Sequence, residues 1–206
     1  AAPFYDGWHW QEFWRTHEGP VVLTNAENLY NEIGQLRILD IGCGTGWYLN
    51  QLGFYALERW GIDVSSGMLK FAKERNPEIR FFQGDVEEAR WNWDCDLVIA
   101  TRVLSHIKNP LDLMKRLASR LSSRGMIIAS DIDAAHNYKA TKLPVAKGSV
   151  FAETYKYDRR WLWKNIGKLG LELEAAYFVY GDGKVYPALN SDEPIGVGGI
   201  AGWIAC

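Results

Sequence analysis

The chain has 206 residues, of which 48% are hydrophobic and 23% are charged, a composition that predicts one globular domain with a well-buried core. Its formal net charge is −2 and its basic residues form no run, so the charge pattern of a nucleic-acid-binding surface is missing. The three cysteines lie at unrelated spacings, at Cys43, Cys95 and Cys206, which argues against a disulfide framework or a zinc site.

Two further features bear on location. No apolar run approaches the roughly 18 residues that a membrane-spanning helix needs, and the opening residues AAPFYDGWHW lack the charged and apolar regions of a signal peptide. Together with the cysteine pattern, these features predict a soluble protein of the reducing cytoplasm that does not associate with a membrane. The sequence does not indicate an oligomeric state.

Residues 1–34 form an aromatic-rich N-terminal segment. Trp10, Phe13 and Trp14 recur at helical spacing, which predicts a helix docked on the core. Because aromatic segments of this kind are also suited to enclosing a flat apolar ligand, Tyr5 and Trp8 are candidate substrate contacts. Aromatic rings can also hold a cationic amine against their faces, so both kinds of ligand stay open.

The next part of the chain, residues 35–131, alternates apolar runs with helical patterns. The runs ILDI, WGIDV, IRFF, DLVIA and MIIAS predict a doubly wound, parallel sheet covered by helices on both faces. Ser65 is the predicted cap of one helix, and Asn109 with Pro110 opens another. The alternation lapses over residues 133–156, a short helix follows near 158–168, and two consecutive final strands within 169–206 predict an antiparallel pair at the sheet edge.

A glycine-rich turn follows the first of these strands and is the most informative feature of the chain. Glycines at 42, 44 and 46 allow positive φ angles and let a ligand approach the main chain. Their G-x-G-x-G spacing differs from the G-x-G-x-x-G of dinucleotide-binding folds. Asp40 enters the turn as a carboxylate that suits a ligand carrying an ammonium and a sulfonium, which favours S-adenosylmethionine.

The motifs that follow this turn extend the pattern. They are GIDVSSGML at 61–69, FFQGDVEEARW at 81–91, CDLVIATRVLSHI at 95–107 and LASRLSSRGMIIASD at 117–131. In order and approximate spacing the set resembles the class I S-adenosylmethionine-dependent methyltransferases, in particular the small UbiE-like (methyltransferase type 11) group. The resemblance implies a Rossmann-like α/β fold: a mostly parallel, seven-stranded sheet with helices on both faces and an antiparallel last strand.

The resemblance also implies roles for residues of the cofactor site. Asp63 ends the second predicted strand, where a carboxylate can accept hydrogen bonds from both ribose hydroxyls. Asp85 and the backbone of Val86 are expected to contact adenine. The remaining candidate cofactor contacts are the turn residues and their neighbours on the strand ends: Asp40, Gly42, Gly44, Gly46, Val64, Met68 and Thr101.

Methyl transfer is an in-line displacement, which positioning in a dry pocket can accelerate without a base. If a base is used, His106 is the leading candidate, because it follows the fourth strand and imidazoles titrate close to neutral pH. Asp131, Asp133 and His136 could approach one another at the end of the fifth strand. Thr101 and Arg102, however, occupy the place of the aspartate that metal-binding relatives use, so we predict no metal requirement.

We therefore expect a single methyltransferase domain over residues 1–206. It comprises an N-terminal aromatic lid (1–34), a cofactor-binding core (35–131), a substrate-side insertion (132–168) and a final strand pair (169–206). The expected methyl acceptor is a small apolar or aromatic molecule with an oxygen, nitrogen or carbon nucleophile, contacted by Tyr5, Trp8, Arg102, His136 and Tyr138. Two other functions stay open: a non-catalytic S-adenosylmethionine-binding regulatory module and, less favoured, a nicotinamide-dependent oxidoreductase.

Overall fold

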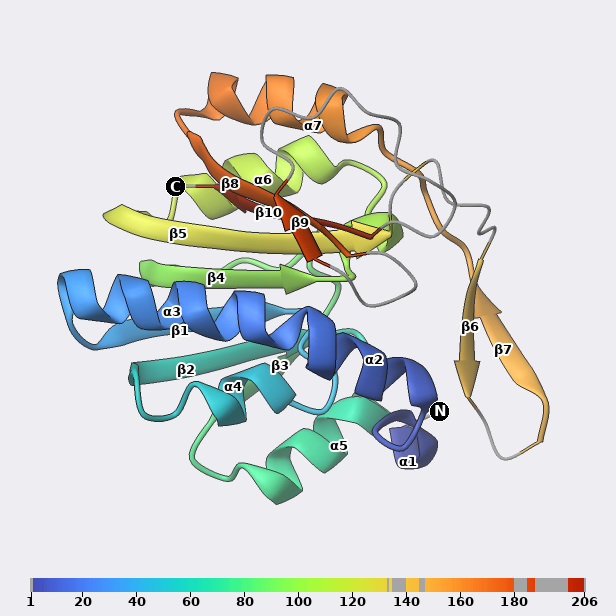
Figure 1. Cartoon of the computed structure of the whole chain (residues 1–206). Coiled ribbons are helices and arrows are strands. Elements are labelled where there is room, and N and C mark those ends of the chain that lie inside the picture. The colour runs from blue at the N-terminus through green and yellow to red at the C-terminus, as the bar shows by residue number, and fades with distance from the viewer. Residues whose placement is uncertain are drawn as a thin grey trace.

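The structure is a computed structural model that describes residues 2–132, 134, 140–144, 147–179, 185–187 and 200–205. Its centre is a sheet in the order β3-β2-β1-β4-β5-β10-β8-β9 (Figure 1). The first five strands in this order are parallel. Their bounds are β1 Leu36–Ile41, β2 Ala56–Asp63, β3 Arg80–Gln83, β4 Cys95–Thr101 and β5 Leu121–Ile132. The predicted doubly wound α/β architecture is therefore confirmed.

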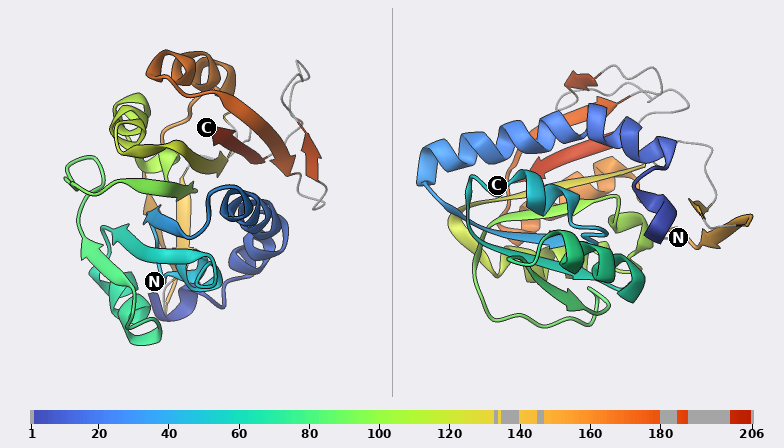
Figure 2. Two further views of the ribbon diagram at one scale, coloured as in Figure 1. Left: turned by 90° about the vertical axis from the view of Figure 1, so that its left-hand side faces the viewer. Right: turned by 90° about the horizontal axis from the view of Figure 1, so that it is seen from below.

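Helices cover both faces of the sheet (Figures 1 and 2). One face carries α3 (Gly19–Ile33), α4 (Trp47–Gln51) and α5 (Ser66–Arg75), and the other carries α6 (Pro110–Ala118) and α7 (Arg159–Ile166). Two short helices, α1 (Ala2–Tyr5) and α2 (His9–His17), precede α3, and 3-10 turns follow β4 (η1, Leu104–His106) and α7 (η2, Gly167–Leu169). The N-terminal segment lies beside the carboxyl ends of the parallel strands.

The helix boundaries follow from local sequence signals. The hydroxyl of Ser65 accepts a hydrogen bond from the backbone N–H of Met68 at 3.3 Å and caps α5. Pro110 opens α6, as its fixed φ angle favours at a first helical position. The carboxylate of Asp158 caps α7 by accepting from the N–H of Trp161 at 2.9 Å. These predicted helix starts are confirmed.

Alternate residues along each central strand supply the two halves of the core. On β4, Leu97 and Ile99 pack with α3, α4 and α5, whereas Val98 and Ala100 pack with α6 and α7. All four side chains are buried. A strand covered on both faces reads as a continuous apolar run in the sequence, which is how CDLVIAT reads.

Three more strands continue the sheet beyond β5. They are β8 (Leu173–Val179), β9 (Val185–Pro187) and β10 (Ile200–Ala205), and each neighbouring pair among β5, β10, β8 and β9 is antiparallel. The expected count of seven strands is not confirmed, because the described sheet has eight. A separate hairpin, β6 (Thr141–Pro144) and β7 (Ser149–Ala152), projects from the molecule near α1. Within the described residues, no helix combines the length and apolarity needed to cross a membrane.

Candidate functional site

A cavity opens at the carboxyl ends of the parallel strands. The strand order reverses between β1 and β4, with β2 and β3 on one side and β4 and β5 on the other, and doubly wound sheets bind their ligands at such a switch point. The cavity is lined by the N-terminal segment, the glycine turn, α4 and the end of β4, through Tyr5, Gln11, Arg15, Asp40, Gly42, Cys43, Gly44, Thr45, Trp47, Tyr48, Thr101 and Arg102.

The glycine turn has the backbone conformation that its spacing predicted. The φ angles of Gly42, Gly44 and Gly46 are +68°, +54° and +79°, in the left-handed region where a side chain is strained. A Cβ atom on Gly42 would also lie 2.9 Å from Cγ2 of Val103, and one on Gly46 would lie 3.0 Å from the ring of Phe81. Packing and conformation therefore both require glycine at these two positions.

Asp63 joins the end of β2 to the glycine turn. Its Oδ2 accepts a hydrogen bond from the N–H of Gly44 at 2.8 Å, and its Oδ1 accepts from the N–H of Ser65 at 2.8 Å. Burial raises the pKa of this carboxyl above its ordinary value, although both hydrogen bonds oppose the shift. Each carboxylate oxygen has two lone pairs, so both oxygens keep an acceptor position for a ligand hydroxyl.

Asp40 is the buried acid of the site. It lies on β1 with 2% of its surface exposed and lines the cavity. Burial and the nearby charge of Asp63 raise the pKa of its carboxyl well above the ordinary value, while Arg102 opposes the shift. A cationic group bound in the cavity would stabilise the ionised form of this carboxyl.

Arg102 lies at the end of β4 in an unusual backbone conformation. Its φ is +56°, which costs roughly 1–2 kcal/mol for a residue with a side chain. The N–H of Arg102 donates to the carbonyl of Ser130 at 2.6 Å, and its guanidinium packs over the ring of Trp14 at 5.3 Å from the centroid. This conformation turns the guanidinium toward the N-terminal segment, where it donates to Oε1 of Gln11 at 3.3 Å. Strain of this kind concentrates at functional sites.

Glu18, at the junction of α2 and α3, neutralises Arg102. Its Oε1 lies 3.4 Å from Nε of Arg102 and accepts from the hydroxyl of Tyr48 at 2.7 Å, while its other oxygen accepts from the hydroxyl of Ser130. Burial disfavours the charged form of Arg102, but the Glu18 carboxylate, acting together with Tyr5, Tyr48 and Asp40, outweighs it, and the pKa of the guanidinium is raised. This buried cluster fixes the N-terminal helices to the sheet beside the cavity.

Glu18, Tyr48 and Ser130 were not among the site residues predicted from the sequence. Glu18 lies in a segment with no motif. Tyr48 and Ser130 lie beside or within quoted motifs, but their polar side chains are ordinary there, and Glu18 and Ser130 are 112 positions apart. Only their burial marks them, at 5% and 3% exposure for Glu18 and Ser130. Glu18 is buried beside Arg102 because of tertiary packing, which cannot be predicted from local sequence patterns.

Four further candidate residues lie around the ends of β2 and β3. Val64 is 70% exposed, whereas Met68 is buried on α5. Asp85 is exposed, and its carboxylate accepts from the N–H of Glu87 at 2.8 Å. Val86 is buried. None of the four lines the cavity described above; Val64 and Asp85 each follow a strand on the side of β1 away from Arg102.

His106 lies outside the cavity lining. It is an exposed residue of η1, and its Nδ1 lies 3.2 Å from the carbonyl oxygen of Glu153. The neighbouring Ser105 donates its N–H to Oδ2 of Asp131 at 2.5 Å, and burial raises the pKa of that carboxyl. Asp131 thus fixes the turn that carries His106. A catalytic role for His106 stays a prediction.

The candidate substrate residues are only partly brought together. Tyr5 and Arg102 line the cavity, and Trp8 lies between α1 and α2 but not in the lining. His136, Tyr138 and Asp133 lie outside the described residues. Among the residues that the structure does describe, no group of three or more histidine, cysteine, aspartate or glutamate side chains is arranged to hold a metal ion.

Comparison with known proteins identifies similar sequences. Residues 39–129 match a family model described as a methyltransferase domain. The ubiquinone biosynthesis O-methyltransferase of Rickettsia bellii (strain OSU 85-389) is 28% identical over 148 residues, which cover 70% of this chain and 58% of that protein. The chain therefore spans little more than half the length of this curated relative.

Solved structures agree in fold. An S-adenosylmethionine-dependent methyltransferase from Mesorhizobium loti superposes with a TM-score of 0.66 at 16% identity, covering 88% of this chain and 95% of that one. The magnesium protoporphyrin IX methyltransferase of Synechocystis PCC 6803, with bound S-adenosylmethionine, has a TM-score of 0.63 at 17% identity, with 95% and 82% coverage. At these identities the likeness is one of fold.

The raised pKa of Asp40 predicts a pH dependence of stability. In the folded protein the carboxyl of Asp40 stays protonated at pH values above its ordinary pKa of 3.8. The stability that this protonation contributes is therefore complete below about pH 4 and is lost as the pH rises through the folded-state pKa. We expect Asp40→Asn to reduce the fall of the unfolding free energy that begins as the pH rises above about 4, by at most about 1.4 kcal/mol per pH unit. Denaturant titration at several pH values measures it.

Asp94→Asn, which changes an exposed aspartate, is the matched control and should leave the slope as it is in the unaltered protein. Asp63 and Asp131 also have raised pKa values, so part of the slope remains in Asp40→Asn. Equal slopes in Asp40→Asn and the unaltered protein would contradict the assignment.

Proposed function

Since this chain belongs to the class I S-adenosylmethionine-dependent methyltransferases, in their type 11 group, we propose that it transfers the methyl group of S-adenosylmethionine to a small molecule. The observation that carries the proposal is the glycine turn, with three positive φ angles, held to the end of β2 by the carboxylate of Asp63. Such a turn at the switch point of a parallel sheet exposes main-chain atoms to a ligand.

In the proposed complex, the ribose lies against Asp63, whose two oxygens each keep a free acceptor position. The adenine extends toward Val64, Met68, Asp85 and Val86. The methionine part lies along Gly42, Gly44 and Gly46, with Thr101 and Asp40 near the sulfonium. A carboxylate buried beside the cavity favours a cation, and the favourable energy is larger than in water because the carboxylate is shielded from solvent.

The proposed function also covers the strand count, the roles of the chain segments, and the location and acceptor of the enzyme. The sheet without the three-residue β9 corresponds to the family's seven strands, in which β10 is the reversed last strand. Residues 1–34 act as a lid, 35–131 as the cofactor core, 132–168 as a substrate-side insertion and 169–206 as the final strand pair. A cytoplasmic location is part of the same proposal. A small-molecule acceptor is supported by the similarity to a ubiquinone biosynthesis O-methyltransferase.

The acceptor is proposed to be apolar or aromatic, because aromatic side chains of the N-terminal segment and of α4 border the cavity. Tyr5 and Trp47 line it, and Trp14 packs beside it under Arg102. The fold fixes the donor and leaves the acceptor to variable segments, and residues 132–168, with His136 and Tyr138, are proposed to complete the acceptor site. We propose that Arg102 and Trp8 also contact the methyl acceptor.

The cofactor assignment is tested by calorimetric titration with S-adenosylhomocysteine and, in parallel, NADH. We expect micromolar binding of the first and none of the second. Asp63→Ala should weaken binding by at least about tenfold, because hydrogen bonds to a charged acceptor contribute about 1.5–3 kcal/mol each. Asp94→Ala serves as the control and should bind as the unaltered protein does.

Two results would count against these assignments. Unchanged affinity in Asp63→Ala would remove the ribose role from Asp63. NADH binding with no binding of S-adenosylhomocysteine would favour the oxidoreductase function instead.

His106 is proposed as a general base if the acceptor needs one. With an acceptor found by mass-spectrometric screening of aromatic and amine compounds, His106→Ala should lower turnover by about 100-fold and remove the base-dependent limb of the pH–rate profile. His17→Ala, which changes a histidine of α2 outside the cavity lining, is the matched control. Full turnover of His106→Ala across pH 6 to 9 would show that positioning alone suffices.

A further inference from the structure

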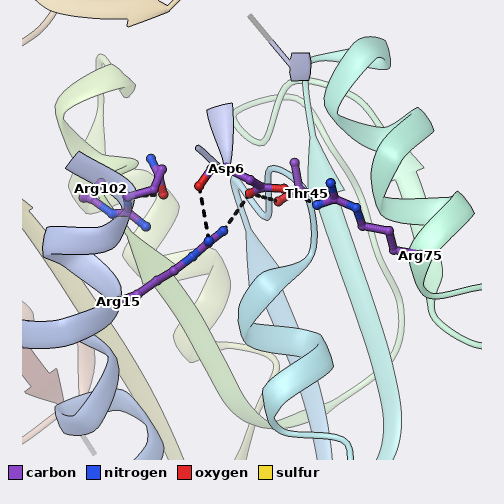
Figure 3. A network of polar contacts seen from close by, with 6 residues as sticks. Asp6, Arg15, Thr45, Arg75 and Arg102 are labelled. Atoms are coloured by element: carbon purple, nitrogen blue, oxygen red, sulfur yellow. Dashed lines mark hydrogen bonds and ion pairs between the residues drawn. The ribbon is translucent and has the colours of Figure 1, made fainter. Parts of the chain in front are cut away.

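Three donors from distant parts of the chain converge on one carboxylate beside the cavity. Oδ1 of Asp6 accepts from Nη2 of Arg15 at 2.6 Å and from the hydroxyl of Thr45 at 2.8 Å, and its Oδ2 accepts from Nη1 of Arg75. The donors come from α2, the glycine turn and α5. Figure 3 shows the two arginines reaching Asp6 from opposite sides, with Thr45 beside it.

Two of the three donors of this cluster border the candidate cofactor cavity. Arg15 and Thr45 line that cavity, and the guanidinium of Arg15 lies over the ring of Trp47 at 5.3 Å. One carboxylate between two guanidiniums leaves an excess of one positive charge in the cluster. Paired N–H donors of arginine match the geometry of a carboxylate. The cluster therefore has the donor set and the charge of a carboxylate-binding site.

Asp6 lies in a short segment, formed by α1 and Gly7, that can move. It follows the four-residue α1 and precedes Gly7, which is exposed and would tolerate a Cβ with nothing within 4 Å. Phe4 is 48% exposed, so α1 buries little apolar surface. Segments with few buried contacts open at low free-energy cost.

The same segment covers the glycine turn. A Cβ on Gly44 would lie 3.7 Å from the ring of Tyr5, the residue before Asp6. A ligand that lies along the turn therefore meets Tyr5, and movement of Tyr5 carries Asp6 with it. Although burial raises the pKa of Asp6, the hydrogen bonds from Arg75, Thr45 and Arg15 outweigh it and lower that pKa, so Asp6 is an anion at neutral pH.

We propose that Arg15, Arg75 and Thr45 form a binding site for the carboxylate of a small-molecule ligand, and that Asp6 occupies this site until the ligand displaces it. The inference rests on the proposed function for what the neighbouring cavity holds. Two ligands can supply the carboxylate: the methionine part of the cofactor or an acidic acceptor. In either case Asp6 is a competitor of the ligand and not one of its contacts.

The test replaces Asp6 by asparagine, which has nearly the same shape but no charge. Asp6→Asn removes the charge, so that a ligand carboxylate binds at the two arginines without displacing an anion. We expect a carboxylate ligand to bind at least about threefold more tightly to this variant in calorimetric titration, and we expect Arg15→Ala in the same chain to abolish the gain. If Asp6 only fastens the N-terminal segment, Asp6→Asn binds the ligand equally or more weakly, which overturns the proposal.

Two pairs of probes distinguish the source of the carboxylate. S-adenosylhomocysteine is compared with 5′-methylthioadenosine, which keeps the adenosine and the sulfur but lacks the amino-acid part. Benzoate is compared with the neutral benzamide, both on protein saturated with S-adenosylhomocysteine. If Asp6→Asn binds S-adenosylhomocysteine more tightly than the unaltered protein does, but not 5′-methylthioadenosine, the site belongs to the cofactor. If it binds benzoate more tightly but not benzamide, the site belongs to the acceptor. No gain in either pair, or an equal gain for the neutral member, overturns the proposal.

Controls separate this inference from the proposed function. Arg124→Ala removes an exposed arginine that pairs with Glu32 near the start of β5, and it should leave all four affinities unchanged. Thermal unfolding checks that Asp6→Asn is folded. If the unaltered protein binds neither adenosine compound, the proposed function fails, and benzoate against benzamide on the ligand-free protein still decides the carboxylate site.

Discussion

The hydrogen bonds of one carboxylate hold the site together. Asp63 ends β2 and accepts from the N–H of Gly44 on one oxygen and from the N–H of Ser65 on the other. The glycine turn is thereby fixed to the neighbouring strand β2. The hydrogen bond to Ser65 also positions the residue that caps α5. Close packing reinforces the arrangement, because a Cβ on Gly61 would lie 2.7 Å from both Sγ of Cys43 and the ring of Phe81. These contacts leave no room for a side chain at Gly61.

The N-terminal segment depends on a second set of buried charges. Glu18 accepts from Tyr48 and Ser130 and lies against Arg102, so the helices before β1 are tied to the ends of β4 and β5. An unpaired charge at this depth would be costly, because burial penalises any ion without a partner. The cluster therefore fixes the deep end of the segment, whereas Asp6 holds its outer end through the half-buried Arg15 and the exposed Arg75. These two attachments differ in the ease with which they open.

The sequence predicted those features that local patterns encode. Alternating apolar runs identified β1 to β5, and the spacing of Gly42, Gly44 and Gly46 identified the turn. The role of Asp63 as a ligand acceptor stays a prediction. The place of β10 between β5 and β8 depends on long-range pairing, which periodicity does not report. Glu18 and Asp6 carry side chains that are ordinary on a surface, and only the fold brings them to the cavity. His106 follows β4 as expected, but its contact with Glu153 could not be read from either segment.

The proposed function requires that S-adenosylmethionine occupies the cavity at the ends of β1 and β4 and extends along the glycine turn to Asp63 at the end of β2. A crystal structure of the protein with S-adenosylhomocysteine tests this claim most directly. The account predicts density along the glycine turn, with both ribose hydroxyls within hydrogen-bond distance of the carboxylate of Asp63 and the sulfur on the side of Asp40 and Thr101. Density for the ligand elsewhere on the protein, or a ribose that does not contact Asp63, would contradict it.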